Sequence, residues 1–362
     1  MDRPVARRSL LALAGGLLLE GCAAGSPAQA ASRKSGSDAP AAARPVATKR
    51  ASGASHSGLP WMSGITGSVL TRDAADEIDA LESFRGRKMD VQTTFANWHL
   101  GWDKWVKAQF WRAGLPQLLA DRGIRVAHST PLLCGGSEGQ FAEAARGDFD
   151  EYHRTVAKRW KDLGHPTPII RLGWETTLNH FPWNALRDET PGYGKYKDAF
   201  RRVADIYRHE LPGCEIDWNN LRRPQVDARR VYPGDDWVDI IGADLYGNRP
   251  RAVVSDTDWD AFANNVENDG PSGPIPFIQF AISRKKKFSV AEWAVTNVDN
   301  DPESPYDSGR YVRGMWEFFN AFAEHLSYEC YFNRKGENGD HRIYPSDFNP
   351  RASAAYKKAW QP

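Results

Sequence analysis

Two glutamates stand out because each ends an apolar, β-branched run and each has a tryptophan beside it. Glu175 closes the stretch "IIRLGWE" directly after Trp174, and Glu292 lies in "FSVAEWAV" directly before Trp293. Two carboxyl groups can divide acid–base work, because a protonated one delivers a proton to a leaving oxygen while an ionised one attacks or stabilises the developing cation. This division of labour is the chemistry of glycoside hydrolysis.

A simpler interpretation exists for each glutamate on its own. A carboxylate at a strand end is more often solvated or ion-paired than catalytic, and Arg171 could be such an ionic partner for Glu175. Two glutamates in the same setting, each beside an indole, favour the catalytic interpretation. The flanking indoles could present apolar faces to sugar rings, and burial against them would raise the pKa of a neighbouring carboxyl group.

The elements that must position these residues alternate regularly along the chain. Stretches of helical period separate most of the apolar runs, for example residues 73–86, 149–164 and 311–326. Eight short runs predict strands, at 63–69, 89–96, 124–133, 169–175, 214–220, 238–246, 288–295 and 326–333. Eight strands alternating with helices predict a (β/α)8 TIM barrel of the α/β class.

An open, doubly wound sheet is the alternative architecture. It is disfavoured because no glycine-rich phosphate turn follows the first run, so the mark of dinucleotide binding is missing. In a barrel, the carboxyl ends of the strands form the catalytic face. Glu175 on the fourth run and Glu292 on the seventh should therefore meet across the mouth of the barrel.

Several stretches resemble the clan of retaining glycosidases and, within it, glycoside hydrolase family 26, which is best known for β-mannanases. The segments that resemble the family are "PIIRLGWE", "YPGDDWVDIIGADLYG", "FSVAEWAV", "FRGRKMDV" and the closing "NPRASAAYKKAW". The resemblance therefore spans roughly residues 60–360. The resemblance implies that Glu175 is the acid/base, that Glu292 is the nucleophile, and that Tyr246 hydrogen-bonds the nucleophile. It implies a retaining endo-β-glycosidase.

This chain departs from the mannanase pattern near the acid/base. Family mannanases usually have histidine immediately before that glutamate and Asn-Gly shortly after it, whereas here Trp174 precedes Glu175 and "TTLN" follows. The third run, "HSTPLLCGG", also lacks the Trp-His pair typical of mannanases. We therefore expect an altered sugar-binding floor, and the substrate stays open among a mannan, a related β-glycan and an exopolysaccharide.

The expected substrate-binding residues are polar or aromatic side chains on the catalytic face: Trp98, His99, Arg171, Trp174, Trp183, Asn219, Asp244, Tyr246 and Trp293. For Trp98 and Trp183, stacking on sugar and packing within a loop are both open. Asn219 could bind a hydroxyl group or serve a turn. A second function also stays open, a polysaccharide-binding barrel that does not hydrolyse its ligand, although the presence of both carboxyl groups favours the enzyme.

The N-terminal segment has the pattern of an export signal, which we place at residues 1–22. A basic start precedes an apolar run from Leu10 to Leu19, which has the length of a secretory core and is short for a bilayer span. Cys22 resembles the lipidated cysteine of a bacterial lipoprotein, which would attach the protein to a membrane, although Glu20 is atypical for that motif. Ordinary cleavage near "AQA" is the alternative.

The amino-acid composition distinguishes a predicted linker from a predicted folded domain. Residues 23–58 are rich in Ala, Ser, Gly, Pro and cations and predict a disordered linker, and residues 59–362 form the predicted catalytic domain. Residues 1–58 carry eight Lys/Arg against three Asp/Glu, so the domain carries 1 − 5 = −4 of the net charge of +1. Such a domain is not suited to nucleic acid. We expect a monomer.

The three cysteines after Cys22 do not form a metal-binding pattern. Cys134, Cys214 and Cys330 lie about 80 and 116 residues apart with no histidine partner nearby, so we expect no metal and no cofactor. One pair could form a disulfide bond, but an odd count leaves at least one thiol free. Each is best interpreted as a small buried apolar residue.

Overall fold

A computed structural model of the chain describes residues 55–67, 74–108, 111, 114–247, 251–299, 301, 303–336 and 338–362. The expected export signal at 1–22, and the expected linker as far as residue 54, lie outside the described residues. Residues 55–58 were also assigned to the linker, but they pack on the domain. Ser57 is buried, and its backbone N–H donates a hydrogen bond of 3.2 Å to Asp90. The folded domain therefore includes residues that precede the expected boundary.

All eight predicted strands form. They are β1 (Met62–Thr66), β2 (Val91–Phe95), β3 (Arg125–Thr130), β4 (Ile169–Leu172), β5 (Glu215–Leu221), β6 (Ile240–Tyr246), β9 (Lys287–Ala294) and β10 (Leu326–Phe332). Their order in the sheet is β1-β10-β9-β6-β5-β4-β3-β2, and each hydrogen-bonded neighbour is parallel. The parallel strands require crossover connections, which the helices supply.

The two edge strands of this sheet, β1 and β2, meet and nearly close it. The Asp90 backbone N–H donates to the Ser63 carbonyl at 3.0 Å. A Cβ atom at Gly64 would lie 1.8 Å from the carbonyl oxygen of Val91, so only glycine lets the strands approach this closely. The (β/α)8 barrel is confirmed.

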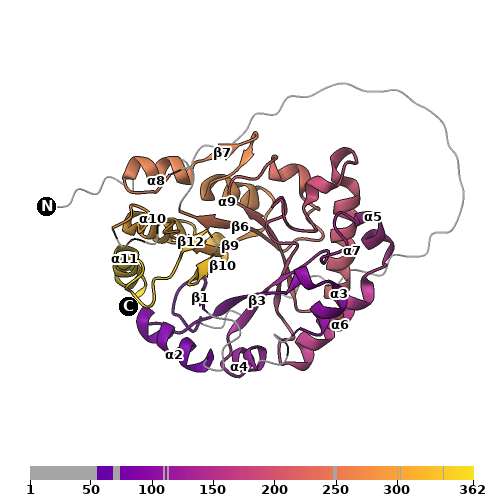
Figure 1. Cartoon of the computed structure of the whole chain (residues 1–362), viewed down its shortest axis with the longest axis horizontal. Coiled ribbons are helices and arrows are strands. Elements are labelled where there is room, and N and C mark those ends of the chain that lie inside the picture. The colour runs from indigo at the N-terminus through magenta and orange to yellow at the C-terminus, as the bar shows by residue number, and fades with distance from the viewer. Residues whose placement is uncertain are drawn as a thin grey trace, which may run out of the picture. The chain divides into compact units, whose positions relative to one another are not determined.

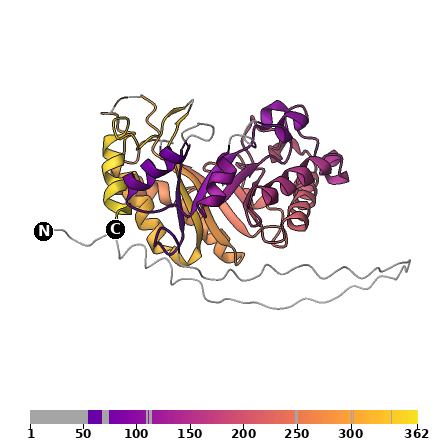
Figure 2. The same ribbon diagram turned by 90° about the horizontal axis from the view of Figure 1, so that it is seen from below.

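The helices form an outer ring around the strands (Figure 1). They are α2 (Ala74–Arg85), α3 (Trp102–Val106), α4 (Leu115–Asp121), α5 (Phe141–Arg146), α6 (Asp150–Asp162), α7 (Gly194–Glu210), α8 (Asp256–Ala263), α9 (Pro274–Ser283), α10 (Gly309–Ala321) and α11 (Pro350–Trp360). The predicted helices at 73–86, 149–164 and 311–326 correspond to α2, α6 and α10. The yellow helix α11 packs beside the indigo helix α2 (Figure 2), so the last helix of the ring meets the first described one.

Helix α6 illustrates why these segments are helical. Its buried residues His153, Val156, Ala157 and Trp160 recur at the spacing of one helical face, while Glu151 and Lys158 on other faces are exposed. The buried face packs against the neighbouring helices α3 and α7.

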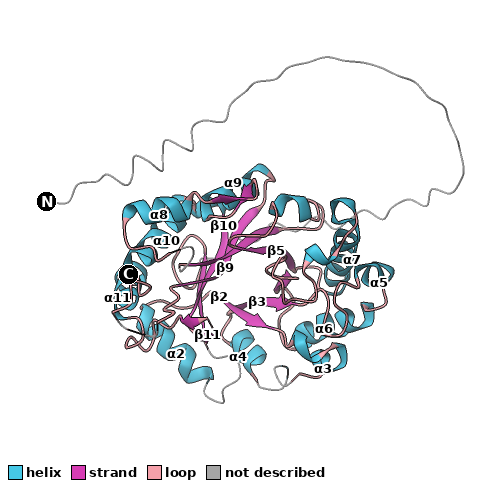
Figure 3. Ribbon diagram, turned by 45° about the horizontal axis from the view of Figure 1, so that its top comes forward, coloured by secondary structure: helices cyan, strands magenta, loops and turns pink. Residues whose placement is uncertain are grey.

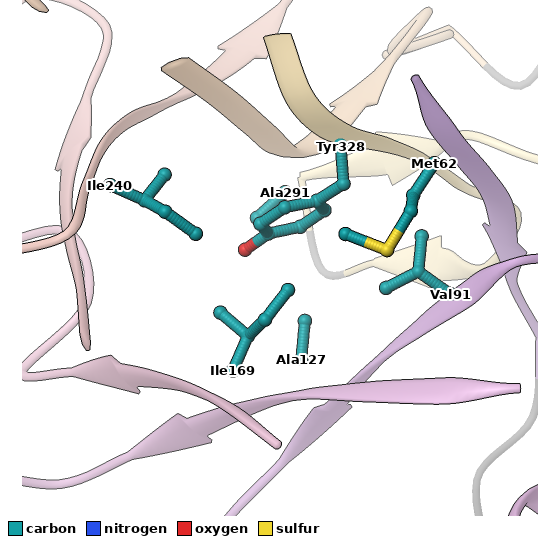
Figure 4. Close-up of a cluster of buried hydrophobic side chains, with 7 residues drawn as sticks. All are labelled: Met62, Val91, Ala127, Ile169, Ile240, Ala291 and Tyr328. Atoms are coloured by element: carbon teal, nitrogen blue, oxygen red, sulfur yellow. The ribbon is translucent and has the colours of Figure 1, made fainter. Parts of the chain in front are cut away.

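Apolar side chains from the strands fill the interior of the barrel (Figure 4). The cluster consists of Met62, Val91, Ala127, Ile169, Ile240, Ala291 and Tyr328, all buried. Each comes from a different strand, so the barrel is a packed core. Side chains alternate between the two faces of a regular strand, so the neighbours of these residues point outward to the helices. Strand β9 is the exception, because its register shifts between Val290 and Trp293, and Ala291 and Glu292 both face inward.

Short elements complete the fold (Figure 3). Two hairpins are β7 (Val266–Glu267) with β8 (Gly270–Pro271), and β11 (Lys335–Gly336) with β12 (Gly339–Asp340). Single 3-10 turns lie at Trp98–Leu100, Ala185–Arg187, Pro191–Tyr193, Ala228–Val231 and Ala323–His325.

The prediction for the cysteines can be compared with this fold. Cys134, Cys214 and Cys330 are all buried and free of disulfide bonds, as expected for small apolar residues. In the described part of the chain, no helix is both long enough and apolar enough to cross a membrane.

Candidate active site

A pocket of about 910 Å³ opens at the carboxyl ends of the strands and contains both glutamates. Glu292 comes from β9, and Asp244 and Tyr246 come from the end of β6. Glu175 comes from the turn that follows β4. Strands that are far apart in the sequence therefore place three carboxyl groups and a phenol around one cavity.

Glu292 is held by two donors, one for each oxygen. Nη2 of Arg171 lies 3.0 Å from Oε1, and the Tyr246 hydroxyl donates to Oε2 at 2.8 Å. The predicted contact between Tyr246 and Glu292 is confirmed. Two donors, one of them a cation, fix the orientation of this carboxyl group. Burial and the neighbouring carboxylates, Glu292 first among them, raise the pKa of Tyr246 well above its ordinary value, so the phenol keeps the proton it donates.

Asp244 connects this carboxylate to the other side of the pocket. Nη2 of Arg171 lies 2.8 Å from Oδ2 of Asp244, and the Asn219 amide nitrogen donates to Oδ1 at 2.9 Å. The amide oxygen of Asn219 accepts the backbone N–H of Glu175 at 3.1 Å. One hydrogen-bonded chain therefore runs from the backbone of Glu175 to the carboxylate of Glu292.

Arg171 is the cation of this chain. Burial alone would lower its pKa, but the carboxylates of Asp244 and Glu292 raise it above its ordinary value, so the side chain stays charged. Burial also raises the pKa of Asp244. A single guanidinium thus serves two carboxyl groups in a dry environment, where each interaction is strong.

Glu175 is positioned by a strained turn. Strand β4 ends at Leu172, three residues earlier than the sequence suggested, because Gly173 and Glu175 both have left-handed backbones, with φ of 55° and 48°. A left-handed backbone costs a non-glycine residue roughly 1–2 kcal/mol, which the surrounding contacts must offset. The turn aims the glutamate side chain into the pocket, where it stays partly accessible.

The environment of Glu175 differs from that of Glu292. Its carboxyl group makes no hydrogen bond with the described residues. Burial, followed by the negative charge of Glu292, raises the pKa of Glu175 to about 8, against the attraction of Arg171. Glu175 is therefore set to hold a proton near neutral pH, whereas Glu292 is bound by two donors. Such separation distinguishes an acid from a nucleophile.

Part of the chain matches a known family. Residues 147–310 match the model of Glycosyl hydrolase family 26, and this segment contains Glu175, Asp244, Tyr246 and Glu292. This segment is similar to glycosyl hydrolase family 26. A mannan endo-1,4-β-mannosidase of Bifidobacterium adolescentis is 23% identical over 240 residues, which are 59% of this chain and 22% of that protein. The chain thus spans about a fifth of the length of this relative.

Solved structures of the family share the barrel. The catalytic domain of a family 26 endo-β-1,4-mannanase from Bacillus sp. JAMB-750 has a TM-score of 0.61 at 16% identity, covering 84% of this chain and 87% of that one. A family 26 protein from Muricauda sp. MAR_2010_75 has a TM-score of 0.58 at 14% identity, covering 83% and 85%. At these identities the likeness shows the fold alone.

The tryptophans beside the two glutamates do not face the pocket. Trp293 is fully buried, and its indole N–H donates to Glu329 at 2.7 Å. Its ring packs against Phe319 and Trp360 on the helix side of the strand. Trp174 is 4% exposed and lies outside the pocket lining. The expectation that these two indoles bind sugar is wrong.

Trp183 is a packing residue rather than a stacking platform. It is fully buried, its ring centroid lies 4.4 Å from that of Trp174, and its indole N–H donates to the Trp174 carbonyl at 2.8 Å. Trp105 is buried in the core, as expected. Of the two roles left open for Trp183, packing is therefore the one that forms, and Trp183 supports the turn that carries Glu175.

Trp98 and His99 lie outside the pocket lining. Trp98 is partly exposed, and its ring stacks on His180 at 6.0 Å. His180 does line the pocket. Trp98 thus supports a residue of the pocket from behind, and His99 is exposed beside it. Neither is placed to touch a sugar bound in this cavity.

Arg171 and Asn219 were expected to bind substrate, and this expectation is wrong. Both are fully buried, and their polar atoms bind Asp244, Glu292 and the backbone of Glu175. They position the carboxyl groups instead. The proposed ion pair of Arg171 with Glu175 does not form, since within the described residues the arginine pairs with Asp244 and Glu292. Asp244 and Tyr246 do line the pocket, so their contact with substrate stays a prediction.

The segment after β10 supplies a wall that sequence reasoning missed. Phe332, Asn338 and His341 line the pocket beside Tyr246. His341 is buried, its Nδ1 lies 2.8 Å from the Val295 carbonyl and therefore carries the proton, and its ring lies 5.1 Å from Tyr246. Burial lowers the pKa of His341. The sequence did offer one indication of this wall, because the segment follows the eighth predicted strand and therefore lies on the catalytic face.

The opposite wall comes from the segment after β5 and from the β7–β8 hairpin. Arg223 pairs with Glu267 at 2.8 Å, and the Asn268 amide donates to the Pro224 carbonyl at 2.8 Å. Gln225 donates to Asn179 at 2.7 Å. These contacts join three loops into one polar wall on the Glu175 side of the pocket. Loop residues of this kind carry no periodic signal in the sequence.

Proposed function

We propose that this protein is a retaining glycoside hydrolase that cleaves a β-linked polysaccharide, with Glu292 as nucleophile and Glu175 as acid/base. One observation carries the proposal. Glu175, with a pKa raised to about 8, and Glu292, bound by two donors, line the same pocket. A protonated and an ionised carboxyl group side by side are what double displacement requires.

In the first step, a Glu292 oxygen attacks the anomeric carbon of the sugar. The bond from that carbon to the leaving oxygen breaks, and the leaving oxygen takes the proton of Glu175. Arg171 and Tyr246 keep the attacking carboxylate oriented. In the second step, ionised Glu175 takes a proton from water, the water oxygen attacks the anomeric carbon, and Glu292 is released.

This mechanism divides the pocket into two sides. The leaving group must lie on the side of the residue that protonates it, so the wall with Arg223, Gln225 and Asn268 faces the leaving sugar. The wall with Phe332 and His341 lies beside Tyr246, which holds the nucleophile, and faces the sugar that is attacked. Phe332 is partly exposed and offers an apolar ring to that sugar.

We propose a mannan or a related β-glycan as the polysaccharide. The support is that the relative from Bifidobacterium adolescentis is a mannan endo-1,4-β-mannosidase and that similar structures include an endo-β-1,4-mannanase. Export, attachment through a lipidated Cys22 and a monomeric state stay predictions.

The alternative of a non-hydrolytic binding barrel finds less support. It relied on an aromatic cleft, but Trp174, Trp183 and Trp293 are turned away from the pocket. The same pocket keeps the hydrogen-bonded network around Glu292, which a protein that only binds sugar does not need.

Product stereochemistry tests the two roles. Glu292→Ala should abolish turnover, and added azide should give the inverted α-glycosyl azide, since the anion then occupies the nucleophile's place. Glu175→Ala should retain turnover on an aryl glycoside whose leaving group needs no proton, and azide should give the retained β-glycosyl azide. The opposite assignment of the two products would exchange the roles.

A polysaccharide panel tests the activity itself. New reducing ends should form from at least one β-linked glycan with the wild-type chain and not with Glu292→Ala. Retardation of the chain in a gel that contains the glycan, without new reducing ends, would instead support the binding barrel.

A further inference from the structure

A second pocket, of about 530 Å³, lies on the outer ring of helices between α10 and α11. It shares no lining residue with the catalytic pocket. Its lining contains four cations and one anion, which are Arg310, Arg313, Arg351, Lys358 and Asp307. The hydrolytic mechanism uses none of these residues, so the pocket requires another explanation.

Small residues make the pocket hollow. A Cβ atom at Gly309 would lie 3.1 Å from the Arg351 carbonyl oxygen and 3.4 Å from Nη1 of Arg313, so this glycine lies directly beneath the Arg313 guanidinium. Ala354 and Ala355 line the same cavity from α11. Val254, which is 56% exposed, adds an apolar edge. The pocket therefore combines an apolar base with cationic side chains.

One of the four cations is already balanced. Arg310 pairs with Asp256 at 2.7 Å and with Glu317 at 3.5 Å. A ligand in the pocket would gain little from this side chain, whose charge is directed to the neighbouring acids.

The anion of the pocket is also committed. Asp307 accepts the backbone N–H groups of Arg351 and Ala352, both at 2.8 Å, and so caps the start of α11. Its contact with the Arg351 guanidinium is longer, at 3.4 Å. Asp307 therefore balances the end of the helix at least as much as the arginine.

The remaining cations give the pocket a surplus of positive charge. Arg313 and Lys358 are exposed, and neither makes an ion pair with a carboxylate of the described residues. The domain as a whole is acidic. The chain carries +1 and residues 1–58 carry +5, so residues 59–362 carry a net charge of −4. The local charge is thus opposite to that of the domain as a whole.

We propose that this pocket binds the carboxylate groups of an acidic polysaccharide, such as a polyuronate, as a site separate from catalysis. An arginine guanidinium matches the planar carboxylate through paired hydrogen bonds, and Lys358 adds a second cation. The apolar base and edge suit the C–H face of a sugar ring. The volume is within the range of ligand pockets.

Charge also selects among possible occupants. Residues 1–58 carry a net charge of +5, so they lack the negative charge that would complement this pocket. A neutral glycan would leave the two cations without a partner. An acidic glycan pairs them and would hold the protein on such a polymer independently of hydrolysis.

Affinity electrophoresis of the full chain tests the proposal with three polymers: polygalacturonate, its methyl ester, and poly(glycerol phosphate). Polygalacturonate should retard the wild-type chain, and the methyl ester, which lacks the charge, should not. Retardation by poly(glycerol phosphate) alone would overturn the carboxylate assignment. Equal retardation by the charged and the esterified polymer would overturn the electrostatic basis.

Variants locate the binding. Arg313→Glu with Lys358→Glu should weaken the apparent affinity for polygalacturonate at least tenfold, and Arg313→Lys with Lys358→Arg should keep it. The matched control, Lys104→Glu with Lys161→Glu, changes the net charge equally at exposed positions elsewhere and should bind like wild type. Equal losses in both charge-reversal variants would show a general charge effect and sink the proposed site.

A further variant separates the cavity from the charge. Ala354 is exposed at the pocket, so Ala354→Leu fills space without changing charge and should weaken binding several-fold. Unchanged affinity would mean that the polymer binds surface cations rather than this pocket. Hydrolysis of a neutral substrate should be the same in all these variants, so the outcome does not depend on the proposed catalysis.

Discussion

Nη2 of Arg171 lies 3.0 Å from Oε1 of Glu292, and both side chains are withdrawn from solvent. The same nitrogen lies 2.8 Å from Asp244, so one guanidinium fixes the nucleophile relative to a second carboxylate. A sugar bound in the pocket cannot reach Arg171, because no part of the arginine side chain is exposed. The arginine therefore acts on the reaction through Glu292, as a positioning residue.

Replacing Arg171 should reduce turnover more than substrate binding. Arg171→Lys keeps the charge but loses the planar fork that serves two carboxylates, so we expect kcat to fall about 100-fold or more while KM changes little. Steady-state kinetics on an aryl glycoside measure both quantities. A thermal melt is the control, since a broken buried pair can also cost about 3–5 kcal/mol of stability. A kcat within twofold of wild type in a folded variant would contradict the positioning role.

The pH profile should report the proton on Glu175. Because the burial of Glu175 and the charge of Glu292 raise its pKa to about 8, the protonated fraction is high below that pH and falls above it. For a substrate with a poor leaving group, kcat/KM should therefore decline as pH rises through about 8. The decline should vanish for Glu175→Gln on an activated aryl glycoside. A basic limb near the ordinary pKa of glutamate would refute the raised value.

The same residue should limit stability at alkaline pH. A carboxyl group whose folded-state pKa is raised binds more protons when folded than when unfolded, so its contribution to stability falls as pH rises from the ordinary glutamate pKa to about 8. Glu175→Gln removes this penalty and should stabilise the domain by on the order of 2 kcal/mol above pH 8, with no gain below about pH 4. Denaturant titrations at pH 4 and 9 measure the difference. Equal gains at both values would mean that another effect operates.

Trp183 should matter for stability and not for a sugar subsite. Because its buried ring packs on Trp174 and its N–H binds the Trp174 carbonyl, Trp183→Ala should cost about 3–5 kcal/mol. Trp183→Phe keeps part of the packing and should lose less, with KM for long and short oligosaccharides unchanged. A KM increase confined to long substrates in the folded Trp183→Phe variant would restore the stacking role.

Much of the site follows from the sequence because strand pattern and barrel topology are strong constraints. Apolar runs at regular intervals predict the eight strands, and parallel strands must bring their carboxyl ends to one face. Glu292, Tyr246 and the turn with Glu175 therefore had to meet. The direction of Trp293 did not follow from alternation, because β9 shifts register between Val290 and Trp293, and Ala291 and Glu292 both face inward.

The rest depends on contacts between segments that have no fixed relation in the sequence. Whether Trp174 and Trp183 face a sugar or each other depends on how the loop after β4 folds back on itself. Phe332 and His341 reach the pocket only because the segment after β10 packs against Tyr246. The raised pKa of Glu175 likewise requires the burial and the charge of Glu292, which lies 117 residues away in the chain. Sequence alone determined which groups meet at the barrel mouth, whereas tertiary packing decided which of them are open to substrate and which carries the proton, because exposure and electrostatic environment are properties of neighbours in space.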